Sequence, residues 1–310
     1  MKRYILRRTL ISIATLMVIL FILFMLLQLL PGSPFNDEKL SMEQRQILAA
    51  KYGLDRPPLV QFFSYIKNML SGDFGVSYNI SKNVPVAELL KSRLVLSAEL
   101  GLWAILIGTI VGFVFGTIAA FNQNTIWDTF STILSVVGVS VPSYVFALGL
   151  SYYFGFKHMW FPILFDATNK QLSMVMPAIS LSLFTMASIA RFTRTEMVEV
   201  LQSDYIMLAE SKGVSGARLL FKHVLRNASI PILTVLAPLV VGLMTGSLVV
   251  EKIFSVPGIG QLLVNAIQSN DYNIILAIAF IYSALFIFVM FVVDILYGIL
   301  DPRIRLVKGE

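Results

Sequence analysis

The sequence contains no cysteine, and only 14% of its 310 residues are charged. The absence of cysteine excludes a disulfide framework, thiol catalysis and any metal site built on cysteine ligands. The charged fraction lies well below the value of about 25% that is typical of soluble domains. There are only two histidines, and we interpret His158 as an interfacial residue beside Trp160 and His223 as a surface residue rather than a metal ligand.

Two motifs that would supply chemistry are also missing. The chain has no GxxxxGK[ST] loop, whose backbone amides would hold the phosphates of a nucleotide, and no HExxH zinc motif. No nucleophile, general base or set of metal ligands is visible inside the apolar runs, which argues against an intramembrane enzyme. We therefore predict a non-catalytic chain that binds no cofactor and no metal itself.

What the sequence does contain is hydrophobic residues, at 57% of the chain. A helix needs about 20 apolar residues to cross a bilayer core. Six runs reach that length without a charged side chain: Thr9–Leu30, Leu100–Phe121, Thr129–Phe156, Leu172–Ala190, Ala228–Val250 and Tyr272–Val293. They lack the alternating polarity of barrel strands, and a soluble fold of this size has no interior large enough to bury them all. The sequence predicts an all-α integral membrane protein with six transmembrane helices.

The first run is not a typical cleavable signal, because it has 22 residues and ends in LLPGSP rather than at a small-residue cleavage site. We expect four regions along the chain. They are an N-terminus with the first helix (1–30), an extracytoplasmic and partly helical segment (31–97), a five-helix core (98–301) and a cytoplasmic tail (302–310).

The distribution of positive charge indicates the orientation. With the N-terminus inside, the inner segments carry thirteen of the 24 Lys and Arg residues, the short outer loops carry three and the long segment 31–99 carries eight. The short loops decide, because long segments cross a membrane largely regardless of charge. We expect both termini in the cytoplasm of a multi-pass protein of the cytoplasmic membrane. The same bias accounts for the net charge of +6 without nucleic acid binding.

The inner segment 191–230 is expected to be ordered. Asp204 is a candidate N-cap for a short helix that starts at Tyr205, and Gly213 suits the left-handed position just past its end. Ser215 is a candidate cap for a second helix leading into the fifth run. The pattern therefore predicts a helix, a glycine turn and a second helix displayed in the cytoplasm.

Arg218, Lys222 and Arg226 recur every four residues and share one face of the predicted second helix. Two interpretations stay open for them, contact with anionic lipid headgroups or contact with a soluble partner.

Two further patterns concern the packing and the shape of the spans. Gly108, Gly112 and Gly116 form overlapping GxxxG steps, for which we favour packing within the chain over a dimer seam. Bends or tolerated kinks are expected at four prolines: Pro142, Pro177, Pro231 and Pro238.

These motifs together resemble the permeases of ABC importers, in the B-type form of the oligopeptide/dipeptide permease family. The resemblance extends from about Arg7 to Arg305 and includes LLPGSP, KYGLDRPPLVQFFSYIKNMLSGDFGVS, VSVPSYVFALGL, SLVVEKIFSVPGIGQLL and VDILYGILDPRIRL. The family's cytoplasmic motif reads Glu-Ala-Ala, three residues, Gly. Here Ala209 and Gly213 fit that motif, whereas Met207 and Leu208 depart from it.

The resemblance implies a type I permease fold in which this chain pairs with a homologous second permease subunit. It also implies two ATP-binding cassette subunits that carry ATP and Mg, and an extracytoplasmic peptide-binding protein. The residues expected to dock on an ATPase are Asp204, Tyr205, Leu208, Ala209, Glu210, Lys212, Gly213 and Ser215. No residues of the substrate pathway are assigned.

Oligopeptides are the expected substrate of such a permease, with dipeptides, nickel complexes or another small solute as alternatives. A self-sufficient ion-coupled carrier is a further alternative from a different class of transporter. It would need ionisable residues inside the membrane or inverted repeats, and neither is evident; Asp294 lies at the inner end of the sixth run and is interpreted as an interface residue rather than a proton relay.

Overall fold

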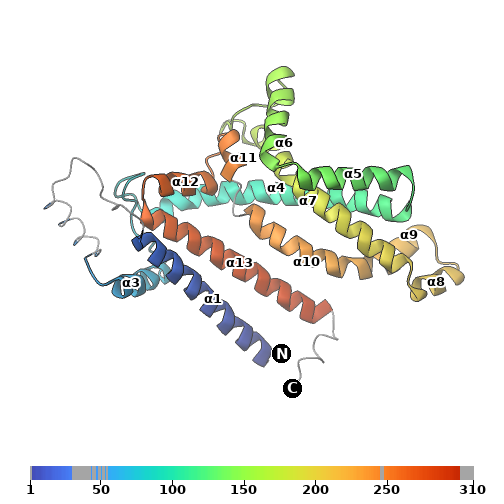
Figure 1. Ribbon diagram of the computed structural model, residues 1–310, viewed down its shortest axis with the longest axis horizontal. Coiled ribbons are helices and arrows are strands. Elements are labelled where there is room, and N and C mark those ends of the chain that lie inside the picture. The colour runs from blue at the N-terminus through green and yellow to red at the C-terminus, as the bar shows by residue number, and fades with distance from the viewer. Residues whose placement is uncertain are drawn as a thin grey trace. The chain divides into compact units, whose positions relative to one another are not determined.

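The computed structural model describes residues 2–29, 43, 47, 50, 53, 55–244 and 248–300. Within these residues the chain is helical, and its one piece of strand-like pairing is an isolated bridge between Val76 and Pro85. The helices, in chain order, are α1 (Lys2–Leu29), α3 (Pro58–Leu70), α4 (Val86–Phe121), α5 (Ile126–Ser140), α6 (Ser143–Leu150), the π-helix η1 (Ser151–Lys157), α7 (Lys170–Leu201), α8 (Asp204–Ser211), α9 (Gly216–Leu219), the π-helix η2 (Leu220–Val224), α10 (Leu225–Met244), α11 (Leu248–Ile253), α12 (Ile259–Gln268) and α13 (Tyr272–Leu300) (Figure 1).

Four helices are long and apolar enough to cross a membrane by themselves, and each overlaps one predicted run. They are Arg7–Leu29, Val86–Phe121, Lys170–Leu201 and Tyr272–Val292. The predicted span over 228–250 begins in α10 and passes through residues 245–247, which lie outside the described residues. An all-α integral membrane fold is therefore confirmed, with four or five candidate spans in the part of the chain that the structure describes.

The run predicted as one span over 129–156 is divided in two. Helix α5 ends at Ser140, and the following α6–η1 pair leaves it at an angle of 102°. Val141 is extended, as a residue before proline prefers, and Pro142 precedes the first turn of α6 without a backbone N–H to donate. The bend expected at Pro142 is confirmed, whereas Pro177 lies inside a continuous α7.

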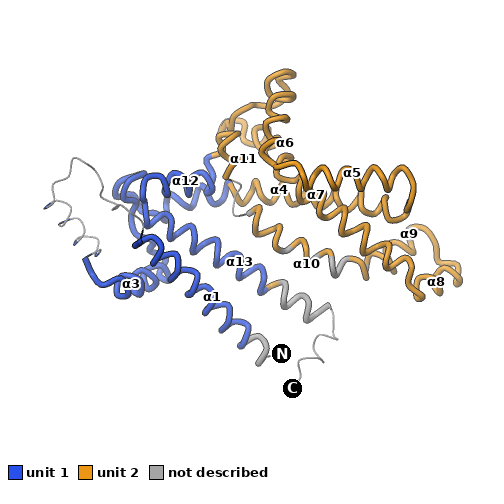
Figure 2. The backbone as a smooth tube through the Cα atoms, viewed as in Figure 1, with its two compact units in different colours: residues 1–96, 257–291 blue, residues 97–256, 292–310 orange. Residues whose placement is uncertain are grey.

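The described chain forms two compact units (Figure 2). The first comprises residues 1–96 and 257–291, and its core is built from α1, α3, α12, α13 and the start of α4. The second comprises residues 97–256 and 292–310. In this second unit α7 is the central helix. Most of its apolar stretch is buried, and it packs against α5, α6 and α10.

Close packing of α4 on α7 explains the glycine pattern. A Cβ atom added at Gly112 would lie 2.5 Å from the Met186 carbonyl oxygen, and one added at Gly116 would lie 2.6 Å from that of Ala190. Gly108 makes a similar approach one turn earlier. The interpretation of this motif as packing within the chain is confirmed, because the glycines bring two helices of the second unit together.

Candidate coupling site

The short helix α8 follows the long helix α7 after a two-residue connection. Its N-cap is Ser203, which is extended, and Asp204 is its first helical residue. The prediction that Asp204 is the N-cap is therefore wrong by one position. A carboxylate in the first turn still favours the helix, because it faces the positive end of the helix dipole.

The end of α8 is formed as the sequence predicts. Gly213 has a φ of +80°, its N–H donates to the Glu210 carbonyl at 2.8 Å, and the Val214 N–H donates to the Ala209 carbonyl at 3.1 Å. These two bonds are the Schellman arrangement, which satisfies carbonyls that a helix end would otherwise leave unpaired. The left-handed conformation predicted for Gly213 is confirmed.

The second predicted helix begins directly after Ser215 but is not uniform. It consists of α9, the π-helix η2 and α10. A π-turn widens the helix locally, so the regular four-residue spacing of the basic side chains does not hold through it. Arg218 and Lys222 are exposed, and the side chain of Arg226 lies outside the described residues.

Helix α8 has two distinct faces. Ile206 and Ala209, at 0% and 7% exposure, pack into a core cluster with Met197 and Leu219. This buried face fixes α8 against the rest of the second unit. On the other side the charged residues of the predicted set, Asp204, Glu210 and Lys212, are exposed.

The outer face of α8 is also unusually apolar for a solvent-facing helix. Tyr205, Met207 and Leu208 are 45%, 64% and 56% exposed, and Phe221 in η2 is 70% exposed. Sequence reasoning missed Met207 and Phe221. The signal was available, because Met207 occupies a helical position beside Leu208 and away from the buried pair Ile206 and Ala209.

Two polar contacts hold the region in place, and neither was expected from the sequence. The Asn227 side-chain amide donates to the Tyr205 hydroxyl and to the His223 carbonyl, both at 3.1 Å, which ties α8 to the start of α10. In the last part of α7, Arg194 donates from Nε to Asp128 Oδ1 at 2.5 Å and from Nη2 to Oδ2 at 2.8 Å. This bidentate pair joins α7 to the first turn of α5.

The sequence comparisons show to which class this multi-pass helical membrane protein belongs. Residues 112–306 match the family "Binding-protein-dependent transport system inner membrane component", and residues 1–95 match the N-terminal region of such membrane components. The chain belongs to this family, the type I permeases of ABC importers, and the resemblance inferred from the sequence motifs is confirmed.

Its relatives cover the whole chain. It is 42% identical over 306 residues to the dipeptide transport system permease protein DppB of Lactococcus lactis subsp. cremoris, covering 99% of this chain and 100% of that one. It is 40% identical to the oligopeptide transport system permease protein OppB of Salmonella typhimurium, covering 98% and 100%. The fold resembles a chain of the MetNI methionine ABC transporter in an inward-facing form, with a TM-score of 0.53, 14% identity and coverage of 69% of this chain and 96% of that one.

Proposed function

We propose that this permease forms half of the membrane pathway of a peptide importer. Its partners are a homologous second permease subunit, two ATPase subunits that bind ATP and Mg, an extracytoplasmic peptide-binding protein and the surrounding bilayer. The observation that carries the coupling part of the proposal is α8, a helix anchored by a buried face that presents Tyr205, Met207 and Leu208 outward.

Oligopeptides are the proposed substrate, in line with relatives named oligopeptide permeases. Dipeptides are a second candidate, because relatives at 42% and 41% identity are named dipeptide permeases. Uptake of labelled peptides of two to six residues by the assembled transporter with its own binding protein separates the two. Transport confined to two-residue peptides would reject the oligopeptide assignment.

The proposed orientation places both termini and residues 191–230 in the cytoplasm and residues 31–97 outside. The chain has no cysteine, so single cysteines can be introduced without background. A membrane-impermeant thiol reagent applied to intact cells should label a cysteine at Asp55 or Asp73 and leave one at Lys212 unlabelled until the cells are opened. Labelling of position 212 from outside would reverse the orientation.

In the coupling step, the outer face of α8 fits into a groove of an ATPase subunit. The apolar side chains provide contact area, and Asp204, Glu210 and Lys212 provide polar contacts at its edge. The Schellman end at Gly213 sets the direction in which α8 is presented. Motion of the ATPase pair is then passed through α8 into α7.

Gly213→Val tests this assignment. A β-branched residue in the left-handed region costs roughly 1–2 kcal/mol, and nothing lies within 4 Å of the added Cβ, so the strain falls on the helix end itself. Peptide uptake and substrate-stimulated ATP hydrolysis should both fall while the complex remains abundant.

Gly72→Val is a matched control, because Gly72 has the same φ of +80° and equally open surroundings but lies in the segment proposed to be outside. Lys222→Ala is a milder cytoplasmic control. Normal uptake by a well-expressed Gly213→Val complex would remove the coupling role from α8.

A further inference from the structure

The side chains of helix α3 fall into three sectors around its axis, according to their polarity and burial. At about 100° per residue, Leu59, Val60, Phe63 and Leu70 fall in one sector, and they are 56%, 48%, 62% and 76% exposed. A second sector holds the buried residues Phe62 and Met69. The third sector is polar and consists of Gln61, Ser64 and Asn68.

The exposed apolar sector of α3 continues an apolar surface of the first transmembrane span. The Phe62 ring packs edge-on against Phe21 of α1 at 5.3 Å between ring centroids and against Phe63 at 5.6 Å. Ile22 and Leu26 on α1 are 53% and 55% exposed. Because α1 is long and apolar enough to cross a membrane, we expect lipid to cover these α1 side chains, and α3 extends that same surface. Lys67, exposed within the apolar sector, has a long stem that lets its ammonium group reach the headgroups.

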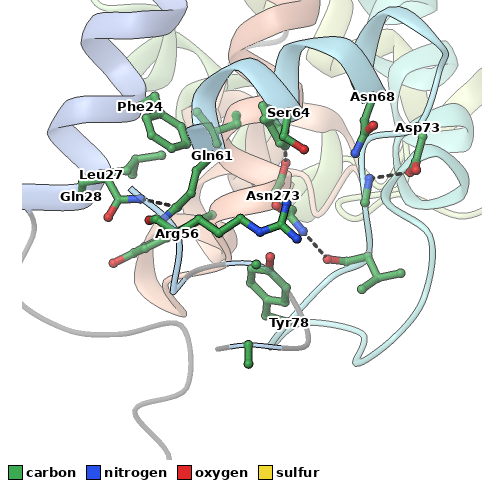
Figure 3. Close-up of a pocket in the computed structure, with 17 residues that line it drawn as sticks. Phe24, Leu27, Gln28, Arg56, Gln61, Ser64, Asn68, Asp73, Tyr78 and Asn273 are labelled. Atoms are coloured by element: carbon green, nitrogen blue, oxygen red, sulfur yellow. Dashed lines mark hydrogen bonds between the residues drawn. The ribbon is translucent and has the colours of Figure 1, made fainter. Parts of the chain in front are cut away.

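The polar sector of α3 faces a pocket of about 450 Å³ in the first unit (Figure 3). Leu27 and Gln28, at the end of α1, line it, and so do Tyr272 and Asn273, at the start of α13. The outer ends of two spans meet there, which is the depth at which lipid headgroups lie. A pocket at this depth and beside a lipid-facing surface is open to a phospholipid headgroup.

The pocket carries one positive and one negative side chain among neutral polar groups. Figure 3 shows Arg56 extending across it toward Asn273 and Tyr78, and among the described residues no hydrogen bond or ion pair engages the Arg56 guanidinium group. The Asp73 carboxylate, on another wall, accepts a hydrogen bond from the Gly75 N–H at 2.9 Å and has further acceptor capacity.

Tyr65 contributes a neutral donor rather than a charge to this pocket. Burial raises the pKa of its hydroxyl, with smaller contributions from Tyr78 and Asp73. The hydroxyl donates to the Asn273 carbonyl at 3.3 Å. The two charged groups of the lining are therefore Arg56 and Asp73, one for each end of a zwitterion.

We propose that α3 is an interfacial helix embedded in the outer leaflet and that the pocket beside it receives a zwitterionic phospholipid headgroup. The phosphate binds Arg56, and the ammonium of a phosphoethanolamine group lies toward Asp73. The term "outer leaflet" rests on the orientation proposed above. The contact of α3 with lipid rests on the exposed sector and its continuity with α1.

The first test compares adjacent positions on different sectors of α3. Phe63→Cys and Ser64→Cys are labelled with a small fluorophore in the assembled transporter, in nanodiscs with or without brominated phosphatidylethanolamine. The label at position 63 should lose fluorescence with brominated lipid and resist aqueous iodide, and the label at position 64, in the pocket that receives the polar headgroup, should be quenched less by the brominated acyl chains. Iodide quenching at 63, or shielding of 63 from both quenchers by a protein neighbour, would overturn the proposal.

The second test concerns the pocket. Phosphatidylethanolamine retained by the purified complex is measured by mass spectrometry for Arg56→Gln and for Lys91→Gln, an exposed charge-removing control on α4. Loss of a charge-assisted phosphate contact should weaken retention by about tenfold, and only in Arg56→Gln. Equal retention in both variants, or displacement of the lipid by a dipeptide at comparable concentration, would overturn the headgroup assignment. Neither readout depends on peptide uptake, so a failed transport role would be detected separately.

Discussion

Removal of the Arg194 side chain should destabilise the fold measurably. Asp128 is only 5% exposed, both its carboxylate oxygens accept hydrogen bonds from Arg194, and the Asn124 N–H donates a third bond to Oδ2 at 3.0 Å. Arg194→Ala leaves that buried charge with a single donor. Breaking one side of a fully buried pair costs about 3–5 kcal/mol. Because the Arg194 side chain is 30% exposed and water screens it partly, we expect about 2–3 kcal/mol here.

The charge-swapped double variant Asp128→Arg/Arg194→Asp tests whether the pair itself is the cause. It should recover only part of the loss, because an arginine in the first turn of α5 opposes the helix dipole and cannot accept the Asn124 N–H. The assay is equilibrium unfolding by SDS in mixed micelles, with both single variants measured alongside. Strictly additive effects, with the double variant as unstable as the sum of the singles, would refute the argument that the contact joins α7 to α5.

Three other outcomes follow from the structure. Gly112→Ala should cost about 1–3 kcal/mol by forcing α4 away from the Met186 carbonyl, whereas Gly149→Ala, with open space around its Cβ, should be neutral or slightly stabilising in the same SDS unfolding assay. Asp271→Ala should increase hydrogen exchange in residues 77–80, because it removes the acceptor for three donors there; unchanged protection would refute that anchoring role. The isolated chain should not be labelled by a photoreactive ATP analogue, since it lacks a phosphate-binding loop, and specific labelling would contradict the proposal that ATP binds only to partner subunits.

Within the described residues, four of the six runs predicted from hydropathy lie in helices of spanning length. Hydropathy reports a preference for lipid and does not report where a helix ends. The second run was placed at Leu100–Phe121, whereas α4 begins at Val86 and includes Glu88, Lys91, Arg93 and Glu99. Glu99 ends the apolar run without ending the helix, because a charged side chain lowers the hydropathy while the backbone continues its own hydrogen bonding.

Local rules predicted the short helix α8 better than they predicted the contacts around it. The left-handed end at Gly213 depends on a few neighbouring residues, so the sequence contains the information. The 102° bend beyond Ser140 depends on what α6 packs against, and the position of Pro142 alone does not set that angle. The contact between Asn227 and Tyr205 joins residues 22 positions apart, and no spacing rule indicates it.

Two buried carboxylates that border the spans give a stronger argument against an ion-coupled carrier than the absence of charged residues within the runs. Glu251 and Asp271 directly flank two predicted runs, and both are 0% exposed. Glu251 accepts a hydrogen bond from Ser97 Oγ at 2.7 Å, and Asp271 accepts one from Ser77 Oγ at 2.5 Å as well as two from backbone amides. A carboxylate that relays protons must exchange them with a water-filled pathway. These two are enclosed and bonded to neighbouring segments, so they are placed to hold α11 against α4 and the 77–80 loop against the start of α13. This favours the proposed energy input through α8 over coupling to an ion gradient.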